Sequence, residues 1–275
     1  MSRSVPAIDR LHRFLSRSSL ATRAAVLLRN QCRAIIKYRL MTTHQVEESG
    51  ELWLAERVAP RCRTFVDVGA NRGEWTAMML RYAPPDVRAV LFEPGTKASA
   101  MLRERFADRA GIEIVSRALS DRPATAARFF EEPDAGNTSS LSRGAATAGA
   151  TETAVDVTTL DIEAERLSIE RIDLLKVDAE GHDLAVLRGA EKLLREDRVG
   201  IVQWEYSDSW IAGGATLAAA LDFLGSFGYQ TWLLKRGGLH RFDYSVFGEY
   251  FTFSNFVSLR PRDLETLAGA VHELL

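Results

Sequence analysis

The feature that most constrains the fold is a regular alternation between short apolar runs and longer amphipathic runs. The run TFVDV at 64–68 is apolar and β-branched, ends at a glycine and precedes a helix-like run at 74–81. Strands that alternate with helices form βαβ units, in which a mostly parallel sheet carries helices on both faces. We therefore predict a doubly wound α/β fold with a seven-stranded sheet. The strands are expected at 64–68, 87–93, 112–115, 172–178, 199–206, 229–234 and 253–259, and the helices at 74–81, 97–107, 184–194 and 217–227.

The first forty residues differ from the rest of the chain in charge. Residues 1–40 contain nine Lys and Arg and one acid, a formal charge of +8, so the remainder carries −10 in a chain of net charge −2. No glycine or proline interrupts residues 7–39, and apolar residues recur there at roughly helical spacing, which predicts one or two amphipathic helices. This N-terminal helical arm can be a cap on the main domain, or it can bind a membrane surface or a protein partner. The predicted domains are this basic arm or cap at 1–50 and one domain at 51–275.

The cysteines and the apolar runs indicate where the protein resides. Cys32 and Cys62 stand 30 residues apart without a CxxC pair, which argues against a disulfide framework or a zinc site and fits a reducing cytoplasm. No apolar run approaches the ~20 residues of a membrane span, and the apolar stretch at 24–28 is too short for a signal peptide. We expect a cytoplasmic protein, peripheral to the membrane if the arm binds lipid. A nearly neutral chain does not indicate a general nucleic-acid binder.

One segment interrupts the alternation. Fifteen of the nineteen residues at 135–153 are Ala, Gly, Ser or Thr, so this stretch offers little to a core. The flanking runs at 128–130 and 154–157 can pair as a hairpin. Long loops in compact domains are usually functional lids or disordered segments, and we favour a lid, inserted at about 131–156.

A glycine-containing loop, VDVGANRG at 66–73, follows the first predicted strand. Gly69 permits a sharp turn and a close approach of a ligand. The helix that begins after Gly73 offers free N–H groups, which suit a carboxylate. Glu93 ends the next strand twenty residues after Gly73, at the place where an acid accepts hydrogen bonds from ribose hydroxyls. The loop is therefore expected to hold a nucleoside cofactor.

The spacing of the loop distinguishes between cofactors. A dinucleotide fingerprint reads G-x-G-x-x-G, but Asn71 and Glu74 stand where its second and third glycines belong. The glycine that admits a pyrophosphate is therefore missing. Asp67 would repel a pyrophosphate but suits the ammonium group of an amino-acid moiety. These features favour S-adenosylmethionine over NAD.

Several blocks together resemble the FkbM-like methyltransferase family. They lie between about 64 and 206 and read VDVGANRG at 66–73, FEP at 92–94, ALSD at 118–121, TLD at 159–161 and IDLLKVDAEGHDLAVLRGA at 172–190. The resemblance implies a Rossmann-like methyltransferase fold and methyl transfer from S-adenosylmethionine, usually to a hydroxyl of a sugar or secondary metabolite. By the same resemblance, the cofactor site includes Gly69, Asn71, Glu93 and the backbone of Ala118 and Leu119.

A second polar cluster follows the fourth predicted strand, at 178–183. Methylation of a hydroxyl needs a positioned acceptor and a route for its proton, and a general base contributes typically ~10²–10⁴-fold. His182 is suited to be that base because histidine titrates near neutral pH, although a loop histidine is often only a surface residue. Asp178 and Glu180 can orient the acceptor, act as the base or hold a metal, and Glu180 can equally be a solvated loop acid. Asp183 is expected to be a helix N-cap.

Glu205, near the end of the fifth predicted strand, should lie close to Asp178. Two such carboxylates can bind Mg²⁺, although we favour a substrate-binding role for Glu205 and leave the metal open. The expected substrate is a small molecule or a glycan. The alternatives are an NAD-dependent oxidoreductase and a non-catalytic module that binds through the basic arm. A nucleic-acid base methyltransferase is disfavoured because no Asn/Asp-Pro-Pro-aromatic run follows the fourth strand. The oligomeric state and the acceptor stay open.

Overall fold

The computed structural model describes residues 6–43, 45–133, 136, 139–145, 149–267 and 271–274. The chain divides into two compact units, Met1–Met41 and Thr42–Leu275, so residues 42–50, which we expected in the arm, belong to the larger unit. The described residues of the smaller unit form the helices α1 (Pro6–Leu15) and α2 (Ser19–Leu40), which confirms the predicted helices. The hydroxyl of Ser18 accepts a hydrogen bond from the N–H of Ala21 and so caps α2.

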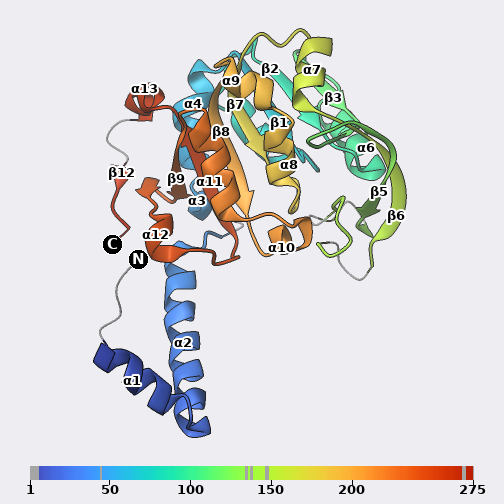
Figure 1. Ribbon diagram of the computed structural model, residues 1–275. Coiled ribbons are helices and arrows are strands. Elements are labelled where there is room, and N and C mark those ends of the chain that lie inside the picture. Colours follow the sequence, from blue (N-terminus) through green and yellow to red (C-terminus); the bar gives the residue numbers. More distant parts are fainter. Residues whose placement is uncertain are drawn as a thin grey trace. The chain divides into compact units, whose positions relative to one another are not determined.

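The larger unit is built on a mixed sheet (Figure 1). In the described part of the chain, nine strands belong to it: β1 (Thr64–Val68), β2 (Arg88–Phe92), β3 (Ile112–Val115), β7 (Ile172–Val177), β8 (Val199–Tyr206), β9 (Gln230–Lys235), β10 (Gly238–Arg241), β11 (Ser254–Leu259) and β12 (Val271–His272). They lie in the order β12-β10-β9-β11-β8-β7-β1-β2-β3. The block from β3 to β8 is parallel, and β11 runs antiparallel to both β8 and β9.

This topology confirms the predicted α/β fold but corrects the predicted number of strands. The seven expected strands form the continuous block from β9 to β3. The expected total of seven was wrong, because β10 and β12 extend the described sheet to nine strands. A tight turn at Gly237, whose φ is 86°, folds β10 back onto β9, and the two-residue strand β12 then pairs with β10. Both added strands are too short to show a period in the sequence.

The predicted hairpin beside the long loop is present. The strands β5 (Ala124–Glu131) and β6 (Thr151–Thr158) pair antiparallel, with Arg128 opposite Ala154. The short strand β4 (Ala118–Leu119) pairs in parallel with the other edge of β6. These strands form a second, smaller sheet in the described residues. The hairpin holds both ends of the long loop in place, and the described residues between β5 and β6 are 132–133, 136, 139–145 and 149–150.

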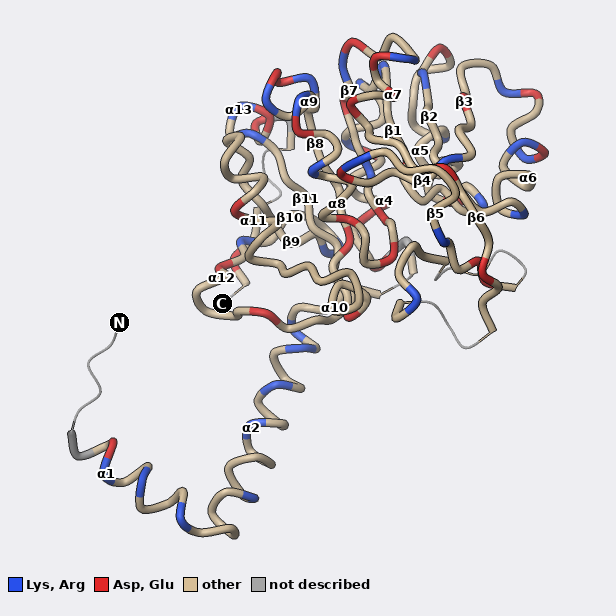
Figure 2. The backbone as a smooth tube through the Cα atoms, turned by 45° about the vertical axis from the view of Figure 1, so that its right-hand side comes forward, with Lys and Arg blue, Asp and Glu red and all other residues tan. Residues whose placement is uncertain are grey.

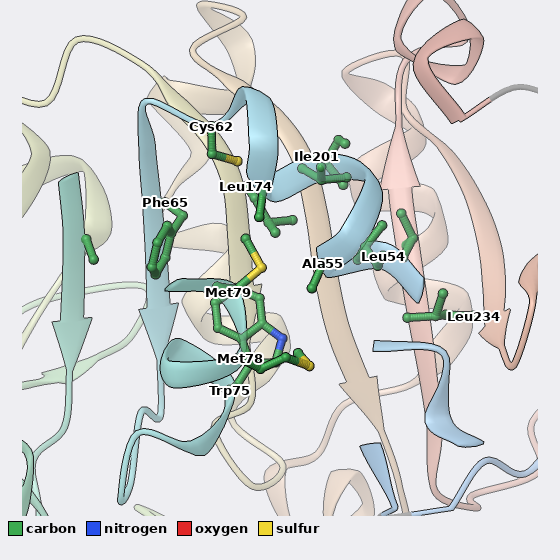
Figure 3. Packing of buried hydrophobic residues seen from close by; sticks show 14 of the residues in the cluster. Leu54, Ala55, Cys62, Phe65, Trp75, Met78, Met79, Leu174, Ile201 and Leu234 are labelled. Atoms are coloured by element: carbon green, nitrogen blue, oxygen red, sulfur yellow. The ribbon is translucent and has the colours of Figure 1, made fainter. Parts of the chain in front are cut away.

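Helices cover both faces of the large sheet (Figure 1). The α-helices of the larger unit are α3 (Val46–Ser49), α4 (Glu51–Val58), α5 (Glu74–Leu80), α6 (Thr96–Arg105), α7 (Leu160–Arg166), α8 (Asp183–Arg188), α9 (Glu191–Arg195), α10 (Ser209–Gly213), α11 (Leu217–Ser226), α12 (Tyr244–Phe247) and α13 (Pro261–Leu264), and the 3-10 turns are η1 (Ala59–Arg61) and η3 (Glu265–Leu267). On one face, apolar side chains of α4 and α5 pack against alternate residues of the strands (Figure 3); these residues include Leu54, Ala55, Phe65, Trp75, Met78, Met79, Leu174 and Ile201. The opposite face carries α8, α9 and α11.

The single helix that we expected at 184–194 is in fact two helices, α8 and α9, separated at Gly189. A β-carbon at Gly189 would lie 2.0 Å from the carbonyl oxygen of Ser120, so the backbone passes directly against the loop after β4. The carboxylate of Asp161 accepts the N–H groups of Lys192 and Leu193 at 2.9 and 3.0 Å. It thereby satisfies donors that the start of α9 leaves without helical partners. The break is stabilised by contacts that are distant in sequence, which periodicity cannot show.

Candidate active site

A cavity of about 930 Å³ opens at the carboxyl ends of the central parallel strands. Ligands of open α/β sheets bind at this edge, and the volume is within the range of small-molecule sites. Nine of the eleven residues that we selected from the sequence line it: Gly69, Asn71, Glu93, Ala118, Leu119, Asp178, Glu180, His182 and Glu205. The other two, Asp67 and Gly73, lie behind its wall.

The loop after β1 is packed directly against the loop after β7. Gly69 has a φ of 76°, and a β-carbon there would lie 1.8 Å from the carbonyl oxygen of Asp178. The N–H groups of Gly69 and Ala70 both donate to the carbonyl of Phe92 at the end of β2. We expected Gly69 to make room for a ligand. In the structure it also makes room for the neighbouring loop, which brings two predicted halves of the site together.

Glu93 connects the glycine loop to the end of β2. Its carboxylate accepts the N–H of Asn71 at 2.8 Å and the N–H of Gly95 at 2.7 Å. The side chain is 5% exposed, and burial raises its pKa to about 7, although the two N–H donors favour the ionised form. Asn71 itself has a φ of 46°, a conformation that few residues other than glycine adopt. Glu93 therefore shapes the loop and also presents a carboxylate to the cavity.

Asp67 lies on the face of β1 that is covered by α5. It is fully buried, accepts a hydrogen bond from the Thr76 hydroxyl at 2.6 Å, and lies 3.5 Å from the ammonium of Lys176. Lys176 is 3.0 Å from Asp178 on its other side. Burial alone would lower the pKa of Lys176, but the charges of Asp178 and Asp67 raise it. The ammonium is therefore charged, and it joins the base of the glycine loop to the cavity wall.

Gly73 begins α5 with a φ of 77° and packs against α6, where a β-carbon would lie 2.6 Å from the ring of Phe106. Ala118 and Leu119, by contrast, form β4 and contribute a buried section of the cavity wall. The rings of Phe92 and Phe129 line the same cavity. This apolar wall suits a flat aromatic group such as a nucleobase.

Three carboxyl groups, those of Asp178, Glu180 and Glu205, line the cavity after β7 and at the end of β8. Burial, followed by the charges of Asp178 and Asp183, raises the pKa of Glu180. Burial, followed by the charges of Asp178 and Glu180, also raises the pKa of Glu205. A carboxyl group with a raised pKa is a stronger proton acceptor once it is ionised. The arrangement therefore favours the protonated forms of Glu180 and Glu205 near neutral pH, in which each can donate a hydrogen bond to a ligand in the cavity.

His182 lies against the loop after β4. Its Nε2 is 2.8 Å from the hydroxyl oxygen of Ser120, and that hydroxyl is 3.1 Å from the carboxylate of Asp121. Burial lowers the pKa of His182 below its usual 6.5, so the imidazole is neutral at physiological pH. A neutral imidazole can accept a proton, and its contact with Ser120 fixes the ring in the cavity wall.

The turn that carries Glu180 is held by Asp183 and by the long loop. Asp183 is the first residue of α8 rather than its N-cap, and its carboxylate accepts the N–H groups of Ala179 and Gly181, both at 3.1 Å. Glu180 has a φ of 48°, a strained backbone of the kind that clusters at functional sites. Its carbonyl accepts the hydroxyl of Ser140 at 2.9 Å. The long loop therefore reaches the cavity, as a lid would require.

Sequence reasoning did not find a further series of hydrogen-bonded side chains in the cavity wall, formed by Glu51, Gln203 and Trp75. Glu51 accepts the side-chain amide of Gln203 at 2.7 Å, and Gln203 accepts the indole N–H of Trp75 at 3.2 Å. Glu51 lies at the start of α4, outside every block that we had considered. Lys176 and Gln203 did give a signal, because each places a polar side chain between apolar neighbours inside a strand. Such positions indicate buried polar pairs.

Two further observations concern metals and membranes. Among the described residues, no group of three or more His, Cys, Asp and Glu side chains is arranged to hold a metal ion. Within the same ranges, none of the helices has both the length and the apolar composition needed to cross a bilayer.

Comparisons with known proteins agree with the resemblance seen in the sequence. Residues 67–231, which include the loops after β1, β2, β7 and β8, match the methyltransferase FkbM domain. This match favours a methyltransferase over the NAD-dependent oxidoreductase. A comparison with curated proteins found no match.

A comparison with solved structures found similar proteins at low identity. Methyltransferase FkbM from Methylobacillus flagellatus is 17% identical with a TM-score of 0.46, over 71% of this chain and 43% of that protein. This chain thus spans less than half of that protein's length. Precorrin-6y C5,15-methyltransferase from Geobacter metallireducens is 10% identical with a TM-score of 0.43, over 80% and 93% of the two chains. Fibrillarin from Aeropyrum pernix, solved with S-adenosyl-L-methionine, is 13% identical with a TM-score of 0.43, over 77% and 76%.

Proposed function

The chain belongs to the FkbM methyltransferase family, and we propose that it transfers a methyl group from S-adenosylmethionine to a hydroxyl oxygen of a sugar, glycan or secondary metabolite. The residues present fit this cofactor. Glu93 offers a carboxylate that can accept from ribose hydroxyls, β4 and Phe129 offer an apolar wall for the base, and acidic side chains suit the positive charge of the sulfonium and ammonium groups. When bound, the cofactor supplies a methyl group activated for in-line displacement.

The observation that supports a hydroxyl acceptor is the neutral imidazole of His182 in the cavity wall, in the same cavity as two carboxyl groups whose pKa values are raised. A hydroxyl is a poor nucleophile until a base takes its proton. His182 is kept neutral by burial, and the pKa values of Glu180 and Glu205 are raised. Of these groups, the imidazole of His182 is the one suited to removing a proton near neutral pH, while the protonated carboxyl groups of Glu180 and Glu205 offer hydrogen bonds to the acceptor in the same cavity.

We assign the roles in this site as follows. Glu93, Asn71 and Gly69 hold the cofactor. Asp178, fixed by the ammonium of Lys176 at 3.0 Å, orients the acceptor hydroxyl.

His182 takes the proton from the acceptor, while Glu180 and Glu205 contact the acceptor by hydrogen bonds. This part of the assignment needs no metal ion, although Asp178 and Glu205 remain candidates to bind Mg²⁺. Residues 139–145 close over the acceptor. The domain from residue 42 onward carries this whole machinery.

The experiment that tests this function uses S-adenosylmethionine with an isotopically labelled methyl group. The protein is incubated with metabolite and glycan fractions, and products are examined by mass spectrometry and by NMR of the labelled carbon. We expect a labelled methyl on oxygen, formed much more slowly with His182→Ala and retained with Asp86→Asn, a control at an exposed position. Label found only on carbon or nitrogen would contradict a hydroxyl acceptor. Cofactor binding without transfer to any fraction would favour a non-catalytic module.

A further inference from the structure

The N-terminal arm, defined here as α1 and α2 of residues 6–40, presents apolar side chains to solvent. On α2, five large apolar residues are between 65% and 77% exposed: Leu20, Leu27, Leu28, Ile35 and Tyr38. Their separations of seven, eight or three residues place them on one face of the helix. On α1, four more are between 43% and 71% exposed: Ile8, Leu11, Phe14 and Leu15. An exposed apolar stripe such as the one on α2 usually marks an interaction surface.

The opposite face of α2 is basic. Arg23, Arg29, Arg33 and Lys37 are all exposed, and the 3.6-residue period places them away from the apolar stripe. Figure 2 shows Lys and Arg recurring along both helices, and by sequence Asp9 is the one acid in residues 6–40. Helix α2 therefore combines an apolar face and a cationic face, and α1 adds exposed apolar residues and further arginines.

From this combination we infer that the arm binds the surface of a membrane that contains anionic lipids. A helix with leucine and aromatic residues on one face and Lys or Arg on the other lies in the plane of a lipid interface, with its apolar face among the acyl chains. The arginine and lysine heads then meet lipid phosphates. This attachment adds to the proposed methyl transfer and does not depend on it.

Two other occupants fit the charges less well. A second copy of the arm could cover the apolar stripe, but residues 1–40 of each copy carry +8 by sequence, and like charges would repel. A nucleic acid would neutralise the arginines but would leave the leucine side chains exposed to water. An anionic lipid surface provides acyl chains for the apolar face and phosphates for the basic face.

The test uses the full chain labelled on Cys32 with an environment-sensitive thiol probe. Cys32 is exposed on α2, whereas Cys62 is buried and burial raises its pKa to about 12, so the probe reacts with Cys32. Labelled protein is mixed with vesicles of phosphatidylcholine alone or of phosphatidylcholine with phosphatidylglycerol, and binding is followed by probe fluorescence and by sedimentation. We expect a blue-shifted probe and co-sedimentation with the anionic vesicles only, decreasing as salt rises.

Two variants separate the contributions of the faces. Leu27→Glu with Leu28→Glu should weaken binding to anionic vesicles about tenfold or more, because it places charge in the apolar stripe. Arg29→Glu with Arg33→Glu should weaken it by a similar factor through the lost attraction to phosphates. Matched controls on the larger unit, Ile162→Glu, where the isoleucine is 45% exposed, and Arg188→Glu, should bind like the wild type.

Three results would overturn the inference. One is a wild-type protein that does not bind anionic vesicles. Another is binding that neither double variant weakens. The third is a wild-type oligomer, seen by light scattering without vesicle binding, that Leu27→Glu with Leu28→Glu dissociates, since this would assign the apolar stripe to a second copy.

Discussion

The carbonyl oxygen of Asp178 lies 1.8 Å from where any β-carbon at Gly69 would be. The loop that is proposed to hold the cofactor and the loop that is proposed to hold the acceptor are thus in main-chain contact. Because Asp178 is also tied through its side chain to Lys176, a change in the first loop must displace the second.

We predict that Gly69→Ala is strongly destabilising because a methyl group cannot fit beside Asp178. Gly228→Ala is the matched control: Gly228 has a similar φ of 82°, but nothing lies within 4 Å of its β-carbon position. The control should lose about 1–2 kcal/mol from the left-handed backbone alone. Gly69→Ala should lose about 2–5 kcal/mol, as overpacking adds to that strain. Urea denaturation measures both, and equal losses would mean that the loops separate easily.

Glu93→Ala should weaken S-adenosylmethionine binding by about 1–3 kcal/mol, the range for a lost hydrogen bond to a charged group. Calorimetry with S-adenosylmethionine and its demethylated product measures this, and NAD should show no binding. Part of the loss will come from the N–H groups of Asn71 and Gly95, which the carboxylate accepts. Unchanged affinity in Glu93→Ala would remove Glu93 from the cofactor site.

Glu93 should also make stability depend on pH. Folding raises its pKa from 4.5 to about 7, so the folded state binds the proton more tightly. The contribution is fully present below about pH 4.5 and is lost as pH rises through about 7. Subtracting the stability of Glu93→Gln from that of the wild type should give a difference that declines by about 3 kcal/mol across this window. The same subtraction for Glu104→Gln, at an exposed position, should stay flat, and a flat result for Glu93 would contradict its burial as an acid.

His182→Ala should lower the rate of methyl transfer by about 10²–10⁴-fold while cofactor affinity stays unchanged. Because burial lowers the pKa of His182 below 6.5, the wild-type rate should rise with pH on the acidic side of that value and then level off. The rise should be absent in the variant. Single-turnover rates across pH provide the measurement, and full activity in His182→Ala would transfer the role of base to a carboxylate.

The variant Asp178→Asn tests whether the charge of Asp178 influences the pKa of Glu205. The charge of Asp178 follows burial as the largest influence that raises the pKa of Glu205. Removing this charge should lower the pKa of Glu205. Any rise in rate that depends on Glu205 should then move to lower pH. The overall rate should also fall, because Asp178 is proposed to orient the acceptor. Asp208→Asn makes the same chemical change on the lining of the same cavity and should leave the position of the rise unchanged. A shift of equal size in both variants would mean that the effect is unspecific.

The parts of the fold that local signals define were predictable from the sequence. The apolar run at 199–206 coincides with β8, and the flanks of the long loop pair as expected. A parallel sheet brings strand ends to one edge, which is why Asp178 and Glu205 line one cavity with Glu93. Whether any of these residues acts in catalysis stays a prediction.

The features of the site that the sequence did not predict depend on contacts between distant segments of the chain. Glu51 joins the cavity wall only because α4 packs beside Gln203, 152 residues later. The buried position of Asp67, in contrast, follows from the pleat of a strand: side chains two residues apart share a face, and Phe65 faces α5. Applying that alternation to β1 would have placed Asp67 behind the cavity wall rather than in it.

The contacts at Gly69 and Gly189 have a consequence for redesign. Each brings one loop against the carbonyl oxygen of another, at Asp178 and at Ser120. Contacts between backbone segments therefore hold the loops of the site together. Lining side chains outside the proposed catalytic set, such as those of Leu141 and Asp208, can then be exchanged without separating these loops. An engineer seeking a different acceptor should therefore vary positions of this kind and keep both glycines and His182. Libraries built this way would sample new pockets on a scaffold that continues to fold.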